Sequence, residues 1–192
     1  MDSGERTLQQ RYDTVDRADR FYDQQVIDRL NPRMREFLAR QEMMFVATAN
    51  RAGECDSTFR AGPAGFVHVL DEHTVAWPEY RGNGVYASLG NISENPHVGL
   101  LFIDFVRDII GLHVNGLAEI VPAEALHDLD EESVPGRRPE RWVRVTVDEA
   151  YIHCGKHIPR LVPRDRDRAW GTDDVRRKGG DFFAVQSDRC EA

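Results

Sequence analysis

Apolar residues near the start of the chain recur at helical spacing. Between positions 11 and 30 they lie three to five residues apart, which is typical of the buried face of an amphipathic helix: Tyr12, Val15, Phe21, Tyr22, Val26 and Leu30. Asn31-Pro32 should end this helix and begin another, because proline is disfavoured inside a helix but tolerated in its first turn. The second helix is expected from Pro32 to about Gln41, with three residues turned inward: Met34, Phe37 and Leu38. The pattern predicts a helical hairpin at the N-terminus.

From Met43 onward the spacing changes to that of β-strands. Short segments rich in β-branched and other apolar residues occur at positions 43–50, 65–70, 74–79, 97–105 and 111–121. Turn-forming residues separate several of them at hairpin intervals, which favours antiparallel pairing in a barrel or sandwich. One short helix is expected among the strands at positions 84–94, where the apolar residues are spaced four and three apart: Val85, Leu89 and Ile92.

The C-terminal part holds one long strand and then an irregular tail. Residues 142–153 alternate cleanly and place three valines on one face: Val143, Val145 and Val147. Positions 160–177 are dominated by arginine and aspartate, and Trp170 is the expected anchor of this surface extension. The predicted organisation is an N-terminal helical segment, residues 1–42, packed on a β-domain, residues 43–160, with a charged extension at residues 161–192.

Composition narrows the class of protein. The chain has 192 residues, with 25 Lys and Arg against 33 Asp and Glu, so its formal charge is −8. This negative balance argues against general nucleic-acid binding, which needs a positive surface. The longest apolar run, 98–105, is too short to span a bilayer, and the polar N-terminus is unlike a signal peptide. The three cysteines are too widely spaced for a disulfide framework. We therefore expect a soluble, cytoplasmic protein with no nucleic-acid or membrane partner.

The densest group of chemistry-bearing residues runs from Trp77 to Gly84, just ahead of Ser88. Arg81, Asn83 and two glycines precede a helix N-terminus, where free amides and a guanidinium suit an anion such as phosphate. An ordinary strand-to-helix turn with a solvated arginine explains the same residues. Motifs of nucleotide-binding loops, serine hydrolases and zinc hydrolases are absent from the sequence.

Two further segments carry polar groups whose role the sequence does not determine. The first places two hydroxyls and a cation close together, although such residues are common on exposed strand faces: Ser57, Thr58 and Arg60. The second holds three potential metal ligands, but no second Cys/His pair completes a tetrahedral site: His153, Cys154 and His157. We therefore expect no metal there, and Lys156 is the more interesting residue, as a cation that could close over an anionic ligand.

In combination these segments resemble the pyridoxamine 5′-phosphate oxidase-like, FMN-binding split-barrel superfamily. The run 74–105 has the family's order of strand, Arg-containing turn, short helix and Asn-Pro-x-Val, which here is Asn95-Pro96-His97-Val98. The preceding hairpin matches the family's opening strands, and the stretch 151–160 resembles a subgroup with His-Cys-x-Lys after the last long strand. The resemblance covers about residues 35–160. It implies a mainly β (α+β) fold, a split β-barrel with an N-terminal helical hairpin and short flanking helices, assembled as a homodimer.

The resemblance also implies where a cofactor would bind. In such proteins FMN sits at the dimer interface, with its phosphate gripped by Ser/Thr, Arg and Lys. Carried onto this sequence, Arg60 and Arg81 become phosphate-binding cations, and Ser57 and Ser88 become hydroxyl donors. The rest of the implied cofactor-binding set is Trp77 and Pro78 beside the isoalloxazine ring, Asn83 and Gly84 at the helix start, and Lys156 with Trp170 from the other subunit.

The implied function is that of an FMN-dependent oxidoreductase, which carries out two-electron redox chemistry on a small molecule. No catalytic acid or base is identified, because the candidates His68, His113 and His157 are chosen only for titrating near neutrality. The chain departs from the true oxidases, since Arg81 is followed by Gly82 and not by lysine. The Arg- and Asp-rich tail also lacks their substrate-phosphate element, so oxidation of the vitamin is not inferred.

Three alternatives stay open at this point. The cofactor of the same barrel could be a deazaflavin, which would make the chain a deazaflavin-dependent reductase. It could be haem, in a haem-binding or haem-degrading protein with His153 or His157 as the axial ligand. The chain could also bind flavin without turnover.

Overall fold

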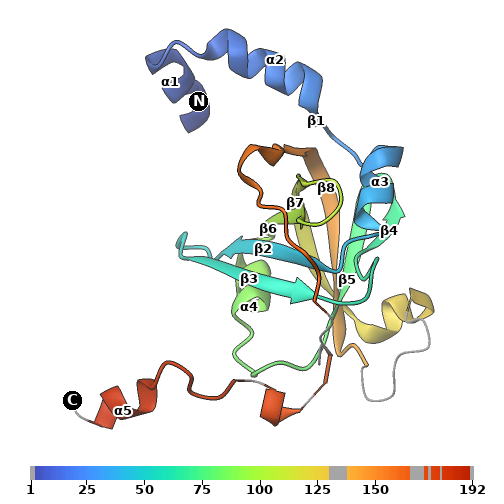
Figure 1. The fold of residues 1–192 in the computed structure, drawn as a ribbon, viewed down its shortest axis with the longest axis vertical. Helices are drawn as coiled ribbons and strands as arrows, with labels where there is room; N and C mark the ends of the chain where they lie inside the picture. The colour runs from blue at the N-terminus through green and yellow to red at the C-terminus, as the bar shows by residue number, and fades with distance from the viewer. Residues whose placement is uncertain (1–2, 130–137, 165–170, 173, 178, 191–192) are drawn as a thin grey trace.

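A curled antiparallel sheet forms the centre of the computed structural model, which describes residues 3–129, 138–164, 171–172, 174–177 and 179–190 (Figure 1). Eight strands are found among these residues: β1 (Val26–Ile27), β2 (Met43–Ala49), β3 (Cys55–Ala61), β4 (His68–Asp71), β5 (Thr74–Glu79), β6 (His97–Asp104), β7 (Ile110–Pro122) and β8 (Arg141–His153). Their order is β3-β2-β6-β7-β8-β5-β4, and β1 pairs with β8 beside this path. The sheet is the split barrel that the sequence predicted.

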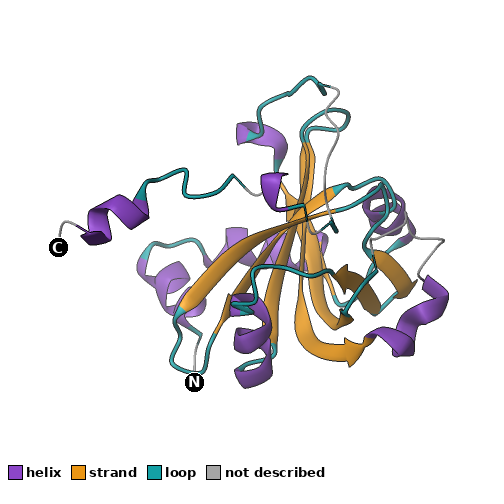
Figure 2. Ribbon diagram, turned by 90° about the horizontal axis from the view of Figure 1, so that it is seen from below, coloured by secondary structure: helices purple, strands orange, loops and turns teal. Residues whose placement is uncertain are grey.

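Helices flank the sheet and lie at both ends of the chain (Figure 2). The described α-helices are α1 (Gly4–Arg11), α2 (Val15–Gln25), α3 (Pro32–Leu38), α4 (Ala87–Glu94) and α5 (Val185–Cys190). Short 3₁₀ helices follow β7 and β8, and a third lies in the C-terminal tail: η1 (Ala123–Leu129), η2 (Gly155–His157) and η3 (Val175–Arg177). Of these elements, α4 is the one that positions the candidate site, because it packs against β2, β3 and β7.

The Asn31-Pro32 boundary is confirmed. The Asn31 side chain accepts a hydrogen bond from the Met34 amide at 3.0 Å, and Pro32 occupies the first turn of α3. The single helix expected before this boundary is wrong in two places. Asp13, with φ of 52°, separates α1 from α2. Val26 pairs with Tyr151 of β8 in an antiparallel register, so that apolar position belongs to a strand and not to a helix face.

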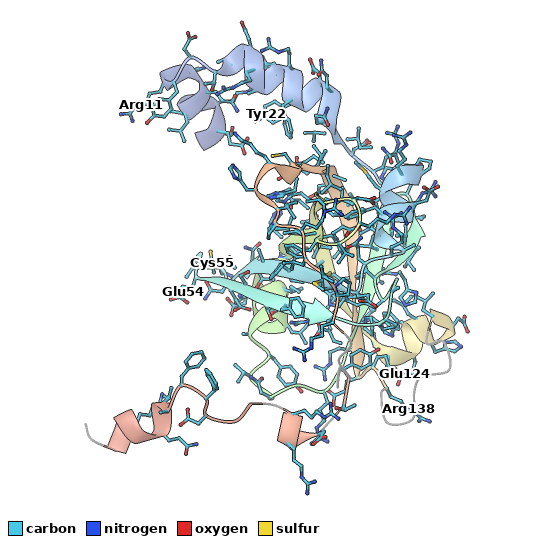
Figure 3. All side chains as sticks on the ribbon, in the orientation of Figure 1. Arg11, Tyr22, Glu54, Cys55, Glu124 and Arg138 are labelled. Carbon is cyan, nitrogen blue, oxygen red and sulfur yellow. The ribbon has the colours of Figure 1, made fainter. Side chains whose placement is uncertain are left out.

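The two N-terminal helices form a projecting unit, here called the helical arm (residues 4–25). Neither α1 nor α2, both fully described, has a buried residue. Their contact is polar: Arg6 pairs with Asp19, and the Tyr22 hydroxyl donates to Glu5 at 3.0 Å. In Figure 3, Tyr22 on the helical arm lies at the opposite end of the molecule from Glu124 and Arg138. Among the described N-terminal residues, Leu30 and Leu38 are fully buried against the barrel.

The core lies inside the curled sheet. The predicted valine face of β8 is confirmed, because Val143 and Val145 are fully buried and Val147 is nearly so. An ion pair also joins two strands that lie far apart in the sheet order. Arg60 of β3, the strand at one end of the sheet order, pairs with Glu79 of β5 at 2.8 Å. This contact brings β3 close to β5, and a pocket lies beside it.

Candidate cofactor site

A pocket of about 580 Å³ opens between β3, β5, the loop 80–86 and the start of α4. Its polar lining residues come from three strands, the loop and the helix: Asp56, Thr58, Arg60, Glu79, Asn83, Ser88, Glu140 and Arg141. Its apolar wall includes Phe66, Pro78, Val85, Tyr86 and Leu89. A concave site with apolar walls and a few converging polar groups is the usual form of a cofactor site.

Arg60 is the cation with the most contacts in the pocket. Its Nε atom donates to Glu79 Oε1 at 2.8 Å, and its Nη1 atom donates to Thr58 Oγ1 at 2.9 Å. Thr58 and Arg60 lie on the same face of β3, because side chains two residues apart in a strand point the same way. The guanidinium is therefore held in a fixed orientation at the pocket wall.

Glu79 is the anionic counterpart of Arg60 and is 9% exposed. The same Oε1 atom that accepts from Arg60 also accepts from the Trp77 indole Nε1 at 2.8 Å. Its backbone carbonyl accepts from the Glu140 amide at 2.9 Å. Glu79 thus connects the pocket to the core at Trp77 and to the first residues of β8.

The N-terminus of α4 faces the pocket without a side-chain cap. Its N-cap residue, Tyr86, has a left-handed backbone with φ of 56° and makes no capping hydrogen bond. The first turn has a partial positive charge and carries no acidic residue of its own. Ser88 is buried and its hydroxyl donates to Asp56 Oδ2 at 3.1 Å. Asn83 shapes the preceding turn by accepting from the Val85 amide at 3.0 Å.

Arg141 is a second pocket cation that the sequence reasoning missed. Its guanidinium carbon lies 4.9 Å from the Tyr86 ring centroid, and its Nη2 atom donates to Glu140 Oε2 at 3.2 Å. Arg141 is the first residue of β8 and pairs in register with Glu79, which is why it reaches the pocket. Among the many arginines of this chain, only the strand pairing distinguishes it, and the sequence alone does not show that pairing.

The structure brings five of the predicted cofactor-binding residues to the pocket: Arg60, Pro78, Asn83, Gly84 and Ser88. The other predicted residues of the same region do not line it. Ser57 lies on the opposite face of β3 from Thr58 and Arg60, and Trp77 is 1% exposed within the core. Arg81 lies in the loop between two lining residues, Tyr80 and Gly82, but is not itself a lining residue.

Lys156 lies elsewhere in its own subunit. It belongs to η2, whose Gly155 lies against the backbone of Ile109, at the turn between β6 and β7. Its predicted contact from a second subunit therefore stays a prediction. Trp170 lies outside the described residues.

The candidate acid–base histidines are likewise outside the described pocket lining. His113 Nε2 lies 3.0 Å from His153 Nδ1, and its ring stacks on Tyr151 at 4.7 Å between centroids. Burial, and then the charge of His153, lower the pKa of His113 against an opposing effect of Glu149. His68 packs edge-on against Trp142. Among the described residues, no group of three or more His, Cys, Asp or Glu is placed to hold a metal ion.

Comparison with solved structures shows the same fold in other proteins. A crystal structure of a histidine-to-alanine variant of HupZ from Group A Streptococcus is 21% identical, with a TM-score of 0.51, and covers 65% of this chain and 99% of that chain. A second HupZ structure from the same organism is 20% identical, with a TM-score of 0.50, and covers 69% of this chain and 98% of that chain. No curated protein matches this sequence. None of the described helices has the length and apolar character that a membrane span requires.

The helical arm and the C-terminal tail lie outside the residues that match a known family model. The family model described as pyridoxamine 5′-phosphate oxidase matches residues 30–154, from two residues before α3 to one residue after β8. This range is well over half of the 192 residues and contains the Arg60–Glu79 ion pair, α4 and Arg141. The chain therefore belongs to the pyridoxamine 5′-phosphate oxidase family.

Proposed function

We propose that this protein is an FMN-binding oxidoreductase that acts on a small molecule, with the flavin in the pocket beside Arg60. The observation that carries the proposal is the composition of that one pocket. It combines a cation, uncapped helix amides, hydrogen-bond acceptors and an apolar wall within about 580 Å³. A flavin mononucleotide needs all four, because it joins a phosphate, a polyhydroxyl chain and a flat ring.

The residues present fit these parts of FMN. Arg60 and the first amides of α4 would hold the phosphate. Asp56, already an acceptor for Ser88, would accept hydrogen bonds from the ribityl hydroxyls. Pro78, Tyr86 and other apolar lining residues would cover the ring and exclude water from it. When bound, FMN supplies the two-electron redox chemistry, and the protein supplies the binding, orientation and electrostatics.

Charge supports a contribution from a second subunit. The charged lining residues of one subunit are Arg60 and Arg141 against three carboxylates, Asp56, Glu79 and Glu140, a formal balance of 2 − 3 = −1. A dianionic phosphate needs more positive charge than this. In the homodimer that we propose, the partner subunit's Lys156 would supply it.

The outer face of the sheet offers a surface for that homodimer. Phe45 and Phe59 lie on adjacent strands, 37% and 51% exposed, with their rings edge to face at 5.6 Å. Leu117 of β7 adds to the exposed apolar side chains at 39%. Exposed apolar groups that cluster on one face mark an interaction surface, and we assign a second copy of this chain to it.

The pocket favours a flavin-type ligand over haem. Haem needs an axial ligand, commonly histidine, and no histidine is among the described residues that line the pocket. A deazaflavin also has a tricyclic ring and a ribityl chain, so the lining does not separate it from FMN. A flavin-binding protein without turnover would have the same pocket.

Reconstitution separates these ligands. The purified protein is incubated with FMN, a deazaflavin or haem, freed of unbound ligand by gel filtration, and analysed by visible absorbance and mass spectrometry. We expect FMN to be retained in the ratio of one per subunit, and to be reduced and reoxidised on the protein. Retention of haem or of the deazaflavin in preference to FMN would contradict the proposal.

A further inference from the structure

We propose that Glu79 is a specificity-determining residue of the pocket, which weakens the contact of the flavin phosphate with Arg60, so that the ring and the ribityl chain supply most of the binding affinity. This inference rests on the proposed function, since it concerns how the same pocket treats its ligand. The consequence is a pocket that holds FMN and the phosphate-free flavin, riboflavin, with similar affinity.

The first step is the position of the carboxylate. Glu79 Oε1 accepts from Arg60 Nε and from Trp77 Nε1, both at 2.8 Å. The side chains of Arg60 and Glu79 are 23% and 11% exposed, so solvent screens this pair less than a surface pair. Removal of one partner from such a pair leaves an uncompensated charge in a partly buried place, so the two side chains stabilise each other.

The second step is what remains of the Arg60 guanidinium for a ligand. Arginine binds phosphate best through two parallel N–H groups. Here Nε is taken by Glu79, and Nη1 donates to Thr58 Oγ1 and to the Phe59 carbonyl at 2.9 and 3.3 Å. Of the three nitrogens of the Arg60 guanidinium, Nη2 is the one without a hydrogen-bond partner among the described residues. A phosphate therefore meets a guanidinium whose bidentate edges are already in use.

The third step is charge. A phosphate bound to Arg60 lies near the Glu79 carboxylate, and two like charges a few ångströms apart in a partly desolvated site repel each other. Asp56 and Glu140 line the same pocket and add to the negative potential. Riboflavin has the ring and the ribityl chain but no phosphate, so it is bound without this repulsion.

The test is the affinity of the protein for FMN and for riboflavin, measured by fluorescence titration on the full chain. In Glu79→Gln the amide oxygen still accepts from Arg60 and Trp77, while the negative charge is removed. We expect this variant to bind FMN about tenfold more tightly than the wild type. Its affinity for riboflavin should stay unchanged, which also shows that the variant is folded. The matched control is Glu36→Gln, an exposed glutamate of α3, which should change neither affinity.

The outcomes are distinct. Equal FMN affinity in Glu79→Gln and wild type, with riboflavin binding intact, overturns the role of Glu79 and leaves the proposed function standing. Failure of the wild type to bind either flavin overturns the proposed function and this inference with it. Should Glu79→Gln not fold, the wild type alone decides. Affinities for FMN and riboflavin within about tenfold support the inference, and a larger preference for FMN overturns it.

Discussion

Arg141 and Tyr86 form a contact that brings a strand end and a helix N-cap to the same pocket wall. The guanidinium carbon lies 4.9 Å from the ring centroid, and the Nη2 atom of Arg141 also donates to the neighbouring Glu140. A guanidinium stacked on a ring keeps its edge N–H groups available, so Arg141 is suited to meet an anionic or hydroxylated ligand.

Arg141→Ala tests this residue. We expect FMN affinity to fall about threefold to tenfold, because one partly exposed charged contact is lost. The measurement is fluorescence titration with FMN, and the matched control is Arg33→Ala, an exposed arginine of α3 outside the pocket lining. Unchanged affinity in Arg141→Ala would show that this guanidinium does not contact the ligand.

His113, on the outer face of the sheet, makes the stability of the folded state depend on pH. Its lowered pKa means that the folded state takes up the proton less readily than the unfolded chain, whose histidine pKa is near 6.5. The stabilising contribution is therefore present above that value and is lost as the pH falls from it toward the lowered pKa of the folded state. The Glu149 carboxylate moderates the loss without reversing it.

The prediction concerns His113→Phe, which keeps an aromatic ring on Tyr151 and removes the titrating group. We expect the wild type to lose more thermal stability than this variant between about pH 7.5 and about pH 5.5. The measurement is the unfolding midpoint by circular dichroism. An equal loss in both proteins would assign the acid sensitivity to other groups.

At the residue scale, the sequence predicted the parts of the site that are contiguous in the chain. Asn83, Gly84 and Ser88 follow one another into α4, so their shared location needed no tertiary information. Trp77 was expected beside the ring, but it alternates with Pro78 along β5 and points into the core. Arg141 could not be predicted, because its place depends on the pairing of β5 with β8.

At the scale of elements, the spacing of apolar residues identified most of the barrel strands. The same spacing did not show that the first two helices bury no residue. The predicted strand at 74–79 is β5 residue for residue. The helical arm has the right period for a buried face, yet buries no residue within α1 and α2. The spacing of apolar residues shows which side of a helix is apolar, and only the tertiary structure shows whether other residues cover that side.

Deletion of residues 1–25 tests the independence of the barrel. The arm meets the barrel through few side-chain contacts, such as the edge-to-face packing of Phe21 on Tyr151. We expect the free energy of unfolding to change by about 1 kcal/mol or less. Urea denaturation followed by circular dichroism measures this change. Loss of the folded barrel would show that the arm is an integral part of it.

At the scale of the whole molecule, the excess of negative charge extends to the candidate site. The chain carries a formal charge of −8, and the pocket of one subunit is also short of positive charge. Positive charge from a second copy would offset the charge of a bound flavin phosphate, and we propose that the dimer contributes to cofactor binding in this way.

Phe45→Glu tests the dimer surface. The variant places a carboxylate beside Phe59 where the wild type has an exposed ring. Burial of this charge in the dimer interface is unfavourable, and the two symmetry-related carboxylates repel each other, so the protein should become monomeric. We expect FMN affinity to fall together with the dimer, as measured by light scattering after gel filtration and by titration. A monomeric variant with full FMN affinity would show that one subunit completes the site. The control Phe21→Glu, on the arm, should leave the dimer intact.

The most direct measurement of the central claim is a crystal structure of the protein reconstituted with FMN. The account predicts the phosphate within hydrogen-bond distance of Arg60 and of the first amides of α4, with the ring against Pro78 and Tyr86. A flavin bound elsewhere, or a pocket beside Arg60 that stays empty at saturating FMN, would contradict it.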